Sequence, residues 1–189
     1  ERSAVMSDAL FAQWKDDWQK MESIARRRGW EVTPLKIAPP ATEVKIAALE
    51  LKHGETIPPH LREVLTRHSA SVAFSWRVPQ HHRPMELVEH LYPSSSGIRG
   101  FVWDLDLIDG YAIENFKGWK RDLETRDLSE AENRPEMWQN QFAFGYLING
   151  DMLTIDVSLP NEPQPVRYFS HEVEGLHGHA IAPDFFSFV

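Results

Sequence analysis

The sequence contains no cysteine and no long apolar run. The absence of cysteine excludes a disulfide scaffold, a cysteine nucleophile and every thiolate zinc site. No apolar stretch approaches the roughly 18 residues that span a bilayer, and the first residues lack the basic start and apolar centre of a secretory signal. We therefore expect a cytoplasmic protein that does not bind membranes.

Basic residues are scarce in the second half of the chain. The first 100 residues carry 14 Lys and Arg against 12 Asp and Glu, whereas residues 101–189 carry 6 against 16. The second half therefore has a net charge of −10, and the whole chain −8. A field of this sign repels phosphate backbones and attracts basic partners, mainly by raising association rates. The sequence disfavours direct nucleic-acid binding and favours a basic protein partner.

The first third of the chain has helical periodicity. The pattern predicts helices over residues 7–28, 41–53 and 58–68, with Ser7 and Thr42 as amino-terminal caps. In the first helix the apolar positions recur at spacings of three and four: Leu10, Phe11, Trp14, Trp18, Met21 and Ala25. In the second helix they are Val44, Ile46, Ala47, Leu49 and Leu51. The proline-rich segment 30–40 between these helices is expected to be a connector with one edge strand.

A short junction separates the second helix from the third. In the stretch "LKHGETIPPHLREVL", Gly54 permits the left-handed backbone that ends a helix. Ile57 is then free to enter the core, and Pro58 or Pro59 begins the next helix, where a missing N–H does no harm. The junction therefore predicts a helix, a stop, a core plug and a second helix.

The rest of the chain is dominated by strand patterns. Alternating or β-rich runs occur in "SVAFSWRV", "IRGFVWDLDLI", "FAFGYLI", "MLTIDVS" and "VRYFS", and Asn149-Gly150 predicts a tight hairpin between the third and fourth of them. Helices first and strands second predict an α+β fold, in which amino-terminal helices pack on a mostly antiparallel sheet of four to six strands. A helix over residues 111–124 and a short carboxyl-terminal helix at "APDFFSFV" complete it.

Several of these segments together resemble one family. A helix with Glu50 and Gly54 near its end precedes Ile57-Pro58 and a second helix. Later in the chain come a Gly-Asp turn, a strand with an Asp, a His-Glu pair and a spaced pair of phenylalanines: Gly150-Asp151, Asp156, His171-Glu172, Ile181-Ala182, Phe185 and Phe188. In order and spacing these positions resemble the SUKH superfamily, which includes Smi/Knr-type cell-wall regulators and bacterial toxin-immunity proteins. The likeness covers residues 41–189, and residues 1–40 add a helix and a Pro-rich connector to one compact unit.

The resemblance implies a non-catalytic protein-binding domain without a cofactor. Family members in bacteria bind and neutralise toxins, often nucleases or deaminases, and members in fungi act as regulatory scaffolds at the cell wall. The first role agrees with the charge of the chain, because a nuclease toxin presents a basic surface that an acidic inhibitor can cover. We therefore expect an immunity protein with a basic toxin as partner, and keep the regulatory scaffold as the alternative.

A metal-dependent hydrolase is the third alternative. Asp104 and Asp106 stand two residues apart on a predicted strand, a spacing at which two carboxylates can share a divalent cation. Their apolar neighbours alternate with them, so the two acids are more simply the wet face of a one-sided sheet. His171, His177 and His179 offer three zinc ligands, but their spacing is not that of a helical His-Glu-x-x-His site. We therefore expect no enzyme activity and no metal.

Two acidic stretches are candidates for the contact with a basic partner. Residues 101–136 hold 10 acidic and 5 basic groups. The first candidate surface is formed by an expected acidic sheet face and a tryptophan: Asp104, Asp106, Asp109, Glu114 and Trp119. The second candidate is the acidic hairpin and the loop that follows: Asp151, Asp156 and Glu172. Charges at the rim of an interface govern mainly the rate of association, whereas a buried tryptophan anchor governs dissociation.

Overall fold

The computed structural model describes residues 6–79, 98–125, 135–147, 150–159, 163–171 and 177–189. The first half of the described chain contains α1 (Asp8–Arg27), β1 (Glu31–Ile37), α2 (Glu43–His53), α3 (Pro59–Glu63), the π-helix η1 (Val64–His68), β2 (Ser71–Arg77) and β3 (Ile98–Asp104). The second half contains α5 (Leu105–Leu107), the π-helix η3 (Ile108–Ala112), α6 (Ile113–Thr125), α7 (Pro135–Trp138), β4 (Gln141–Tyr146), β5 (Met152–Asp156), β6 (Val166–Phe169), β7 (His179–Ala182) and α8 (Phe185–Phe188). The α+β class is confirmed.

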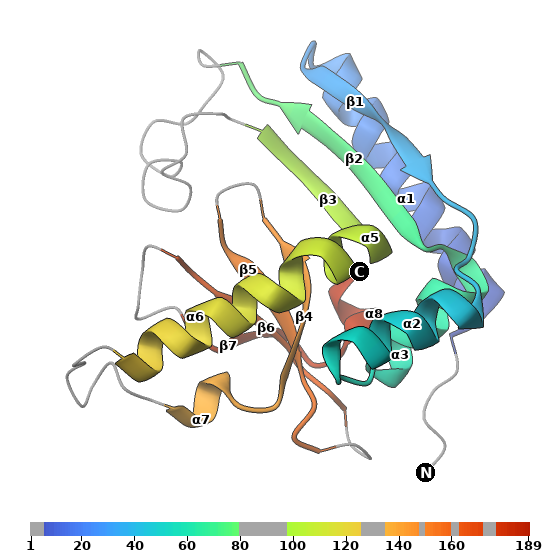
Figure 1. The fold of residues 1–189 in the computed structure, drawn as a ribbon. Coiled ribbons are helices and arrows are strands. Elements are labelled where there is room, and N and C mark those ends of the chain that lie inside the picture. Colours follow the sequence, from blue (N-terminus) through green and yellow to red (C-terminus); the bar gives the residue numbers. More distant parts are fainter. Residues whose placement is uncertain (1–5, 80–97, 126–134, 148–149, 160–162, 172–176) are drawn as a thin grey trace.

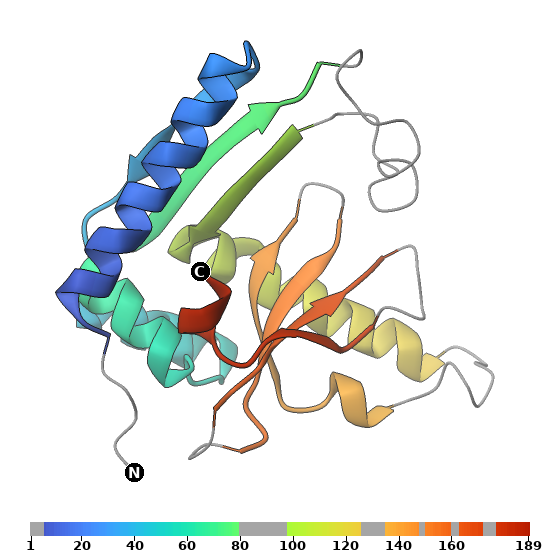
Figure 2. The ribbon, with the colours of Figure 1, turned by 180° about the vertical axis from the view of Figure 1, so that it is seen from behind.

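The strands form two antiparallel sheets. One has three strands in the order β1-β2-β3, and the other has four in the order β4-β5-β6-β7. Figure 1 shows α1 against the three-stranded sheet and α6 along the four-stranded sheet, and Figure 2 shows the same layers from behind. The expected single sheet is therefore divided in two, because the chain turns into α5, η3 and α6 where β3 ends. The last strand, β7, was not expected from the sequence.

The junction after α2 is built as the sequence predicts. Gly54 has φ +67°, in the left-handed region, and its N–H donates to the Glu50 carbonyl. Ile57 is fully buried, and Pro59 is the first residue of α3, with Pro58 as its amino-terminal cap residue. Gly54 therefore ends α2, Ile57 enters the core, and Pro59 begins α3, in the order that the sequence predicts.

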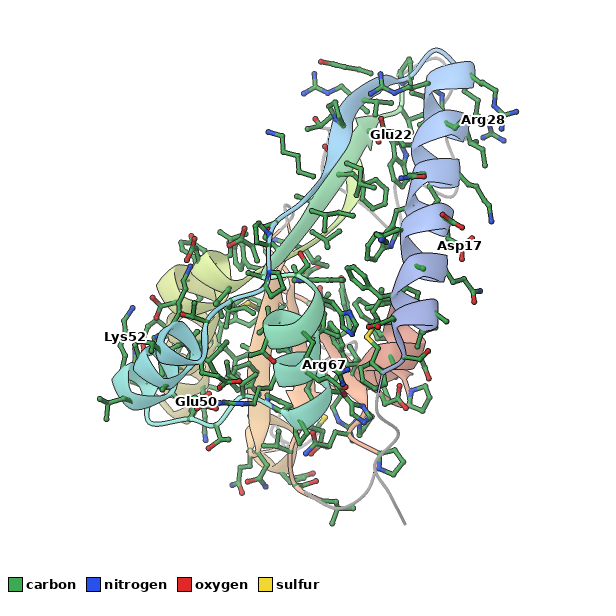
Figure 3. The ribbon with its side chains drawn as sticks, turned by 90° about the vertical axis from the view of Figure 1, so that its right-hand side faces the viewer. Asp17, Glu22, Arg28, Glu50, Lys52 and Arg67 are labelled. Atoms are coloured by element: carbon green, nitrogen blue, oxygen red, sulfur yellow. The ribbon has the colours of Figure 1, made fainter. Side chains whose placement is uncertain are left out.

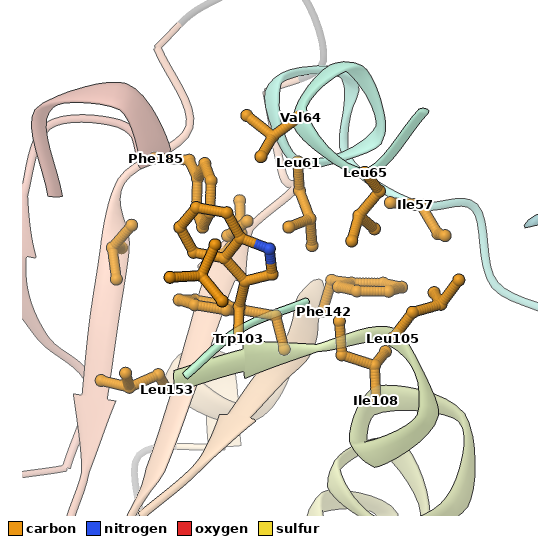
Figure 4. Packing of buried hydrophobic residues seen from close by; sticks show 14 of the residues in the cluster. Ile57, Leu61, Val64, Leu65, Trp103, Leu105, Ile108, Phe142, Leu153 and Phe185 are labelled. Atoms are coloured by element: carbon orange, nitrogen blue, oxygen red, sulfur yellow. The ribbon is translucent and has the colours of Figure 1, made fainter. Parts of the chain in front are cut away.

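A large apolar core joins the helices to both sheets. Trp103 of β3 lies at its centre, and its indole N–H donates to the Ser69 carbonyl at 3.2 Å. Phe185 of α8 packs edge-on against Trp103, at 6.0 Å between ring centroids. Figure 4 shows Leu61 and Phe142 approaching the same centre from α3 and β4. The short last helix is therefore fixed by the core, as the apolar carboxyl-terminal pattern predicts.

A second, smaller core lies under α6. Phe116 of α6 stacks on Trp138 of α7, at 5.5 Å between ring centroids, and contacts Phe169 of β6 edge-on at 5.1 Å. Met152 of β5 and Ala143 of β4 are buried in the same cluster. This cluster holds α6 on the four-stranded sheet, which places the polar side of α6 at the surface.

The outer face of α2 differs from the sequence expectation. Val44 and Leu51 were expected among the apolar core positions, but their exposed fractions are 80% and 86%. Ile46, Leu49 and His53 form the buried face instead. Because these two sets lie on different sides of one helix, periodicity alone does not decide which side meets the core.

The hairpin between β4 and β5 is confirmed where the structure describes it. The strands pair antiparallel, and the Leu147 N–H donates to the Asp151 carbonyl at 2.7 Å. Gly150 has φ +95°, a value that favours glycine. Asn149, the other residue of the predicted turn, lies outside the described residues.

Candidate interaction surface

Asp104 marks the point where the expected strand stops. One carboxylate oxygen of Asp104 accepts hydrogen bonds from the N–H groups of Asp106, at 2.7 Å, and Leu107, at 3.1 Å. The other oxygen accepts from the Ser71 hydroxyl at 2.7 Å. Asp104 is thus the amino-terminal cap of α5. The prediction that Asp104 and Asp106 share one face of a strand is wrong, because capping by Asp104 outweighs the local apolar alternation.

The other acids of the first candidate surface pair with lysines. Asp106 lies 2.6 Å from the Lys45 ammonium of α2, and Asp109 lies 2.9 Å from the Lys52 ammonium. Glu114 is 3.8 Å from Lys117, one turn further along α6. Asp106, Asp109 and Glu114 do come together on one side of the molecule. Lysines from α2 and α6 reduce their net field.

A buried histidine ties these elements together. The His53 Nδ1 lies 3.1 Å from a Glu114 carboxylate oxygen, and its Nε2 lies 3.0 Å from an Asp109 carboxylate oxygen. The Lys117 ammonium donates to the His53 carbonyl at 2.9 Å. Hydrogen bonds from Lys52 and His53 lower the pKa of Asp109, and the hydrogen bond with His53 lowers that of Glu114. His53 was not among the predicted contact residues. Its position before Gly54 marks the end of α2, but its partners in η3 and α6 lie 56 and 61 residues further along the chain.

Trp119 lies on the other side of α6. It is half-buried and contacts Trp138 edge-on, with 6.5 Å between ring centroids. Trp119 follows Glu114 by five positions, an offset that turns an α-helix by about 140° and separates the tryptophan from the acidic group. The predicted surface of four acids and a tryptophan is therefore not one patch. Trp138 is buried beneath Trp119 and serves as packing.

A small pocket opens beside Trp119. It has a volume of about 170 Å³ and is lined by Trp119, Asp122, Leu123, Trp138, Ser170, His171 and His177. The His177 ring meets Trp138 at 5.0 Å between centroids and an interplanar angle of 61°. The Nδ1 of His177 is buried without a hydrogen-bond partner, and burial lowers the pKa of this histidine. The wall of the pocket thus contains a neutral ring near pH 7.

The described acids of the second candidate surface, Asp151 and Asp156, have structural partners within the chain. Asp151 has an exposed fraction of 1%, and its carboxylate accepts hydrogen bonds from the Tyr168 hydroxyl and from the backbone N–H and ring Nδ1 of His171. Asp156 pairs with the Arg167 guanidinium at 2.9 Å. Asp151 is therefore wrong as a contact residue, because it holds two strands and a loop together. Glu172 lies outside the described residues.

The three histidines considered as zinc ligands have separate places in the described part of the chain. His171 is bound to Asp151, His177 lines the small pocket, and His179 is an exposed residue of β7. In the described part of the chain, no three His, Asp or Glu side chains are grouped so that they could hold a metal ion. The described helices also include none that is long and apolar enough to cross a bilayer.

A larger groove lies on the flank of α6 opposite the small pocket. Its volume is about 540 Å³. The junction residues Ile57, Pro58 and Pro59 form one wall, and Phe116 and Lys120 of α6 form another. The two cavities share Trp138 as a lining residue. We call α6 with these two flanking cavities the α6 surface.

The comparison with family models decides which family the chain belongs to. The model of the SMI1 / KNR4 family (SUKH-1) matches residues 40–189. The chain is a SUKH-1 protein. The match begins at residue 40, between β1 and α2, so it includes the junction, every strand from β2 onward and the α6 surface. Comparisons with curated proteins and with solved structures gave no match.

The residues that carried the resemblance have structural roles in this SUKH-1 chain. One carboxylate oxygen of Glu50 accepts from the Ile57 N–H at 3.0 Å and from the Arg62 guanidinium at 2.7 Å. Figure 3 shows Glu50 between α2 and α3. Gly54 and Ile57 complete the same junction. The Glu-x-x-x-Gly and Ile-Pro positions thus form one hydrogen-bonded junction that fixes the angle between α2 and α3.

Two partly buried histidines, His68 and His177, give the SUKH-1 chain a testable pH dependence. His68 stacks on Phe11 at 4.8 Å, and burial lowers its pKa, as it does for His177. Because the unfolded state binds these protons first, the free energy of unfolding should fall as the pH drops below 6.5. Each histidine contributes at most about 1.4 kcal/mol per pH unit.

Urea unfolding at pH 7.5, 6.5 and 5.5 measures this slope. The double substitution His68→Phe and His177→Phe keeps the aromatic packing and should flatten it. The carboxylates with lowered pKa, such as Glu22 and Asp156, lose their contribution only below about pH 4.5, outside this range. An equal slope in the wild type and the double variant would contradict the assignment.

Proposed function

We propose that this SUKH-1 chain is a non-catalytic protein-binding domain, and that it acts as an immunity protein for a basic bacterial toxin of the nuclease or deaminase type. Membership of the SMI1 / KNR4 family carries the proposal. The charge of −10 in residues 101–189 supports a basic partner, because such a field accelerates the approach of a positively charged protein.

The α6 surface is the proposed contact. The acids Asp106, Asp109 and Glu114 stand at its beginning, and the groove and the small pocket flank the helix. Pairing with lysines weakens the field of each of these carboxylates, so steering comes from the net charge of −10 of residues 101–189 as a whole and not from single acids. The half-buried Trp119 supplies an aromatic residue of the type that anchors interfaces.

A regulatory scaffold of the cell-wall type is the second candidate. The exposed side of α2 favours it, because Val44 and Leu51 form an apolar face that a charge-steered toxin contact does not use. The two candidates differ in their effect on the partner. An immunity protein abolishes the activity of one basic toxin, whereas a scaffold binds its partner without inhibiting it.

Identification of the partner comes first. The chain is immobilised and exposed to the purified products of neighbouring genes. A basic domain that binds one to one, and whose toxic activity is lost on binding, supports the immunity role. Binding without inhibition supports the scaffold. If none of these products binds, the inference of a basic partner from the charge of the chain is wrong.

Charge reversal at Asp106 then tests the contact. The side chain of Asp106 is 78% exposed, and its ion pair with Lys45 is of the exposed kind, worth about 0–1 kcal/mol, so Asp106→Lys should fold. We expect association with a basic partner to slow by roughly three- to tenfold at low salt, with little change at high salt. Stopped-flow or surface-binding kinetics at two ionic strengths measure this.

Asp17→Lys is the matched control for that reversal. Asp17 is an exposed acid that pairs with Lys20 at 2.9 Å, much as Asp106 pairs with Lys45. It projects from α1, on the opposite side of the molecule from Lys52 (Figure 3). Both variants change the net charge by the same amount, so an equal slowing in both would place the contact away from the α6 surface.

A further inference from the structure

The small pocket beside Trp119 has the composition of a site for a cation. Two indole rings, from Trp119 and Trp138, and the neutral ring of His177 form its walls, and the Asp122 carboxylate lies among the lining residues. No Lys or Arg is among the described residues that line it. Aromatic faces attract cations through their quadrupoles, and an adjacent carboxylate adds a charge of the right sign.

The size of the pocket restricts the ligand to one side chain. Small-molecule sites have volumes of roughly 300–1,000 Å³, and this pocket has about 170 Å³. Leu123 adds an apolar wall along which an alkyl chain can lie. A side chain with an alkyl stem and a charged end fits these dimensions better than a free metabolite does.

The angles between the rings favour an ammonium over a guanidinium. Trp119 and Trp138 meet at an interplanar angle of 64°, and Trp138 and His177 at 61°. Steeply inclined rings form a corner that surrounds a compact cation, whereas a planar guanidinium stacks best on a flat face. His177 also has a buried Nδ1 without a hydrogen-bond partner in this wall.

We propose that the pocket formed by Trp119, Trp138, His177 and Asp122 binds a lysine side chain of a partner protein. This inference deepens the proposed function, since it names the chemical group by which the α6 surface anchors a basic partner. Trp119 forms the half-exposed wall of the pocket, and Trp138 forms a buried wall that stacks on Phe116.

A capped Gly-Lys-Gly tripeptide tests the pocket without any partner protein. The indole N–H resonance of Trp119, assigned by its loss in Trp119→Phe, reports binding in NMR titrations. We expect saturable shifts with the lysine peptide, and about tenfold weaker binding of the Gly-Norleucine-Gly peptide, which has a similar apolar chain without the charge. Equal binding of the two peptides, tighter binding of a Gly-Arg-Gly peptide, or no saturable shift would each overturn the proposal.

Two variants separate the charge from the rings. Asp122→Asn should weaken lysine binding by roughly threefold to tenfold, and Trp119→Ala should reduce it below detection, with far-ultraviolet circular dichroism to confirm the fold. Asp17→Asn, which changes an exposed acid of α1 outside the α6 surface, is the control and should leave the affinity unchanged. Equal losses in Asp122→Asn and Asp17→Asn would show a non-specific charge effect and overturn the proposal.

The pocket and the proposed function fail in different ways. If a basic partner binds and Trp119→Ala leaves its dissociation rate unchanged, the lysine pocket is wrong and the protein-binding function stands. If the lysine peptide binds but no basic protein does, the pocket stands and the immunity function is wrong.

Discussion

Replacing Glu50 by alanine is expected to lower the free energy of unfolding by about 3 kcal/mol. The Glu50 carboxylate accepts hydrogen bonds from the N–H of Ile57 and from the Arg62 guanidinium. Ile57 is buried and the Glu50 side chain is only 21% exposed, so the Ile57 N–H would lose its acceptor in a place that water reaches only in part. The loss should also loosen the angle between α2 and α3.

Two further substitutions at the junction make this result interpretable. Glu50→Gln keeps an acceptor for the Ile57 N–H and loses the charge opposite Arg62, so it should cost about half as much. Glu43 also pairs with Arg62, at 2.6 Å, but its side chain is 69% exposed, and Glu43→Ala should cost less than about 1 kcal/mol. Urea denaturation measures all three. A Glu50→Ala variant as stable as Glu43→Ala would contradict the structural role of the Glu-x-x-x-Gly motif.

Replacing Asp151 by alanine should have an effect of similar size, about 3 kcal/mol. The carboxylate is buried and accepts from the Tyr168 hydroxyl and from two nitrogen atoms of His171. Its removal leaves these donors without an acceptor beneath the sheet surface. Asp151→Asn retains one carbonyl acceptor and should lose less stability than Asp151→Ala.

The Asp151 substitution also separates two accounts of the hairpin. As a contact residue, Asp151 would affect partner binding and leave stability unchanged. As a buried acceptor, it affects stability, and any loss of binding follows from the folded fraction. Asp106→Ala, an exposed acid, is the control for stability and should change it by less than about 1 kcal/mol. A stable Asp151→Ala variant with weakened binding would restore the hairpin as an interface.

The sequence predicts most of the helices because their boundaries are local. Ser7 and Thr42 accept hydrogen bonds from N–H groups three residues later, as their positions before the apolar runs predict. Gly54 ends α2 by its left-handed backbone, and Pro59 starts α3. In each case the residue that sets the helix boundary interacts with residues a few positions away, so a short stretch of sequence is enough to predict the boundary.

The candidate contact residues were harder to predict because distant segments decide their roles. Asp104 caps a helix and binds Ser71, which is 33 residues away, and Asp151 is buried by groups 17 and 20 residues further on. His53 joins two helices that are about 60 residues apart. A carboxylate in a polar stretch has the same appearance in the sequence whether it faces solvent or a buried donor.

The division into two sheets has a similar cause. The alternation in "IRGFVWDLDLI" continues past Asp104, so it predicts a longer strand than the backbone forms. The hydrogen bonds of the Asp104 carboxylate with the N–H groups of Asp106 and Leu107 end β3 and begin α5. Local capping thus decides where the first sheet ends and where the chain begins to cross to the second.

Titration of the purified chain into an activity assay of a basic toxin encoded beside it tests the central claim most directly. The proposed immunity function predicts that toxin activity falls in proportion to the added chain and disappears at one equivalent, and that Asp106→Lys slows the onset of inhibition more than Asp17→Lys does. Full toxin activity in the presence of excess folded chain would contradict it.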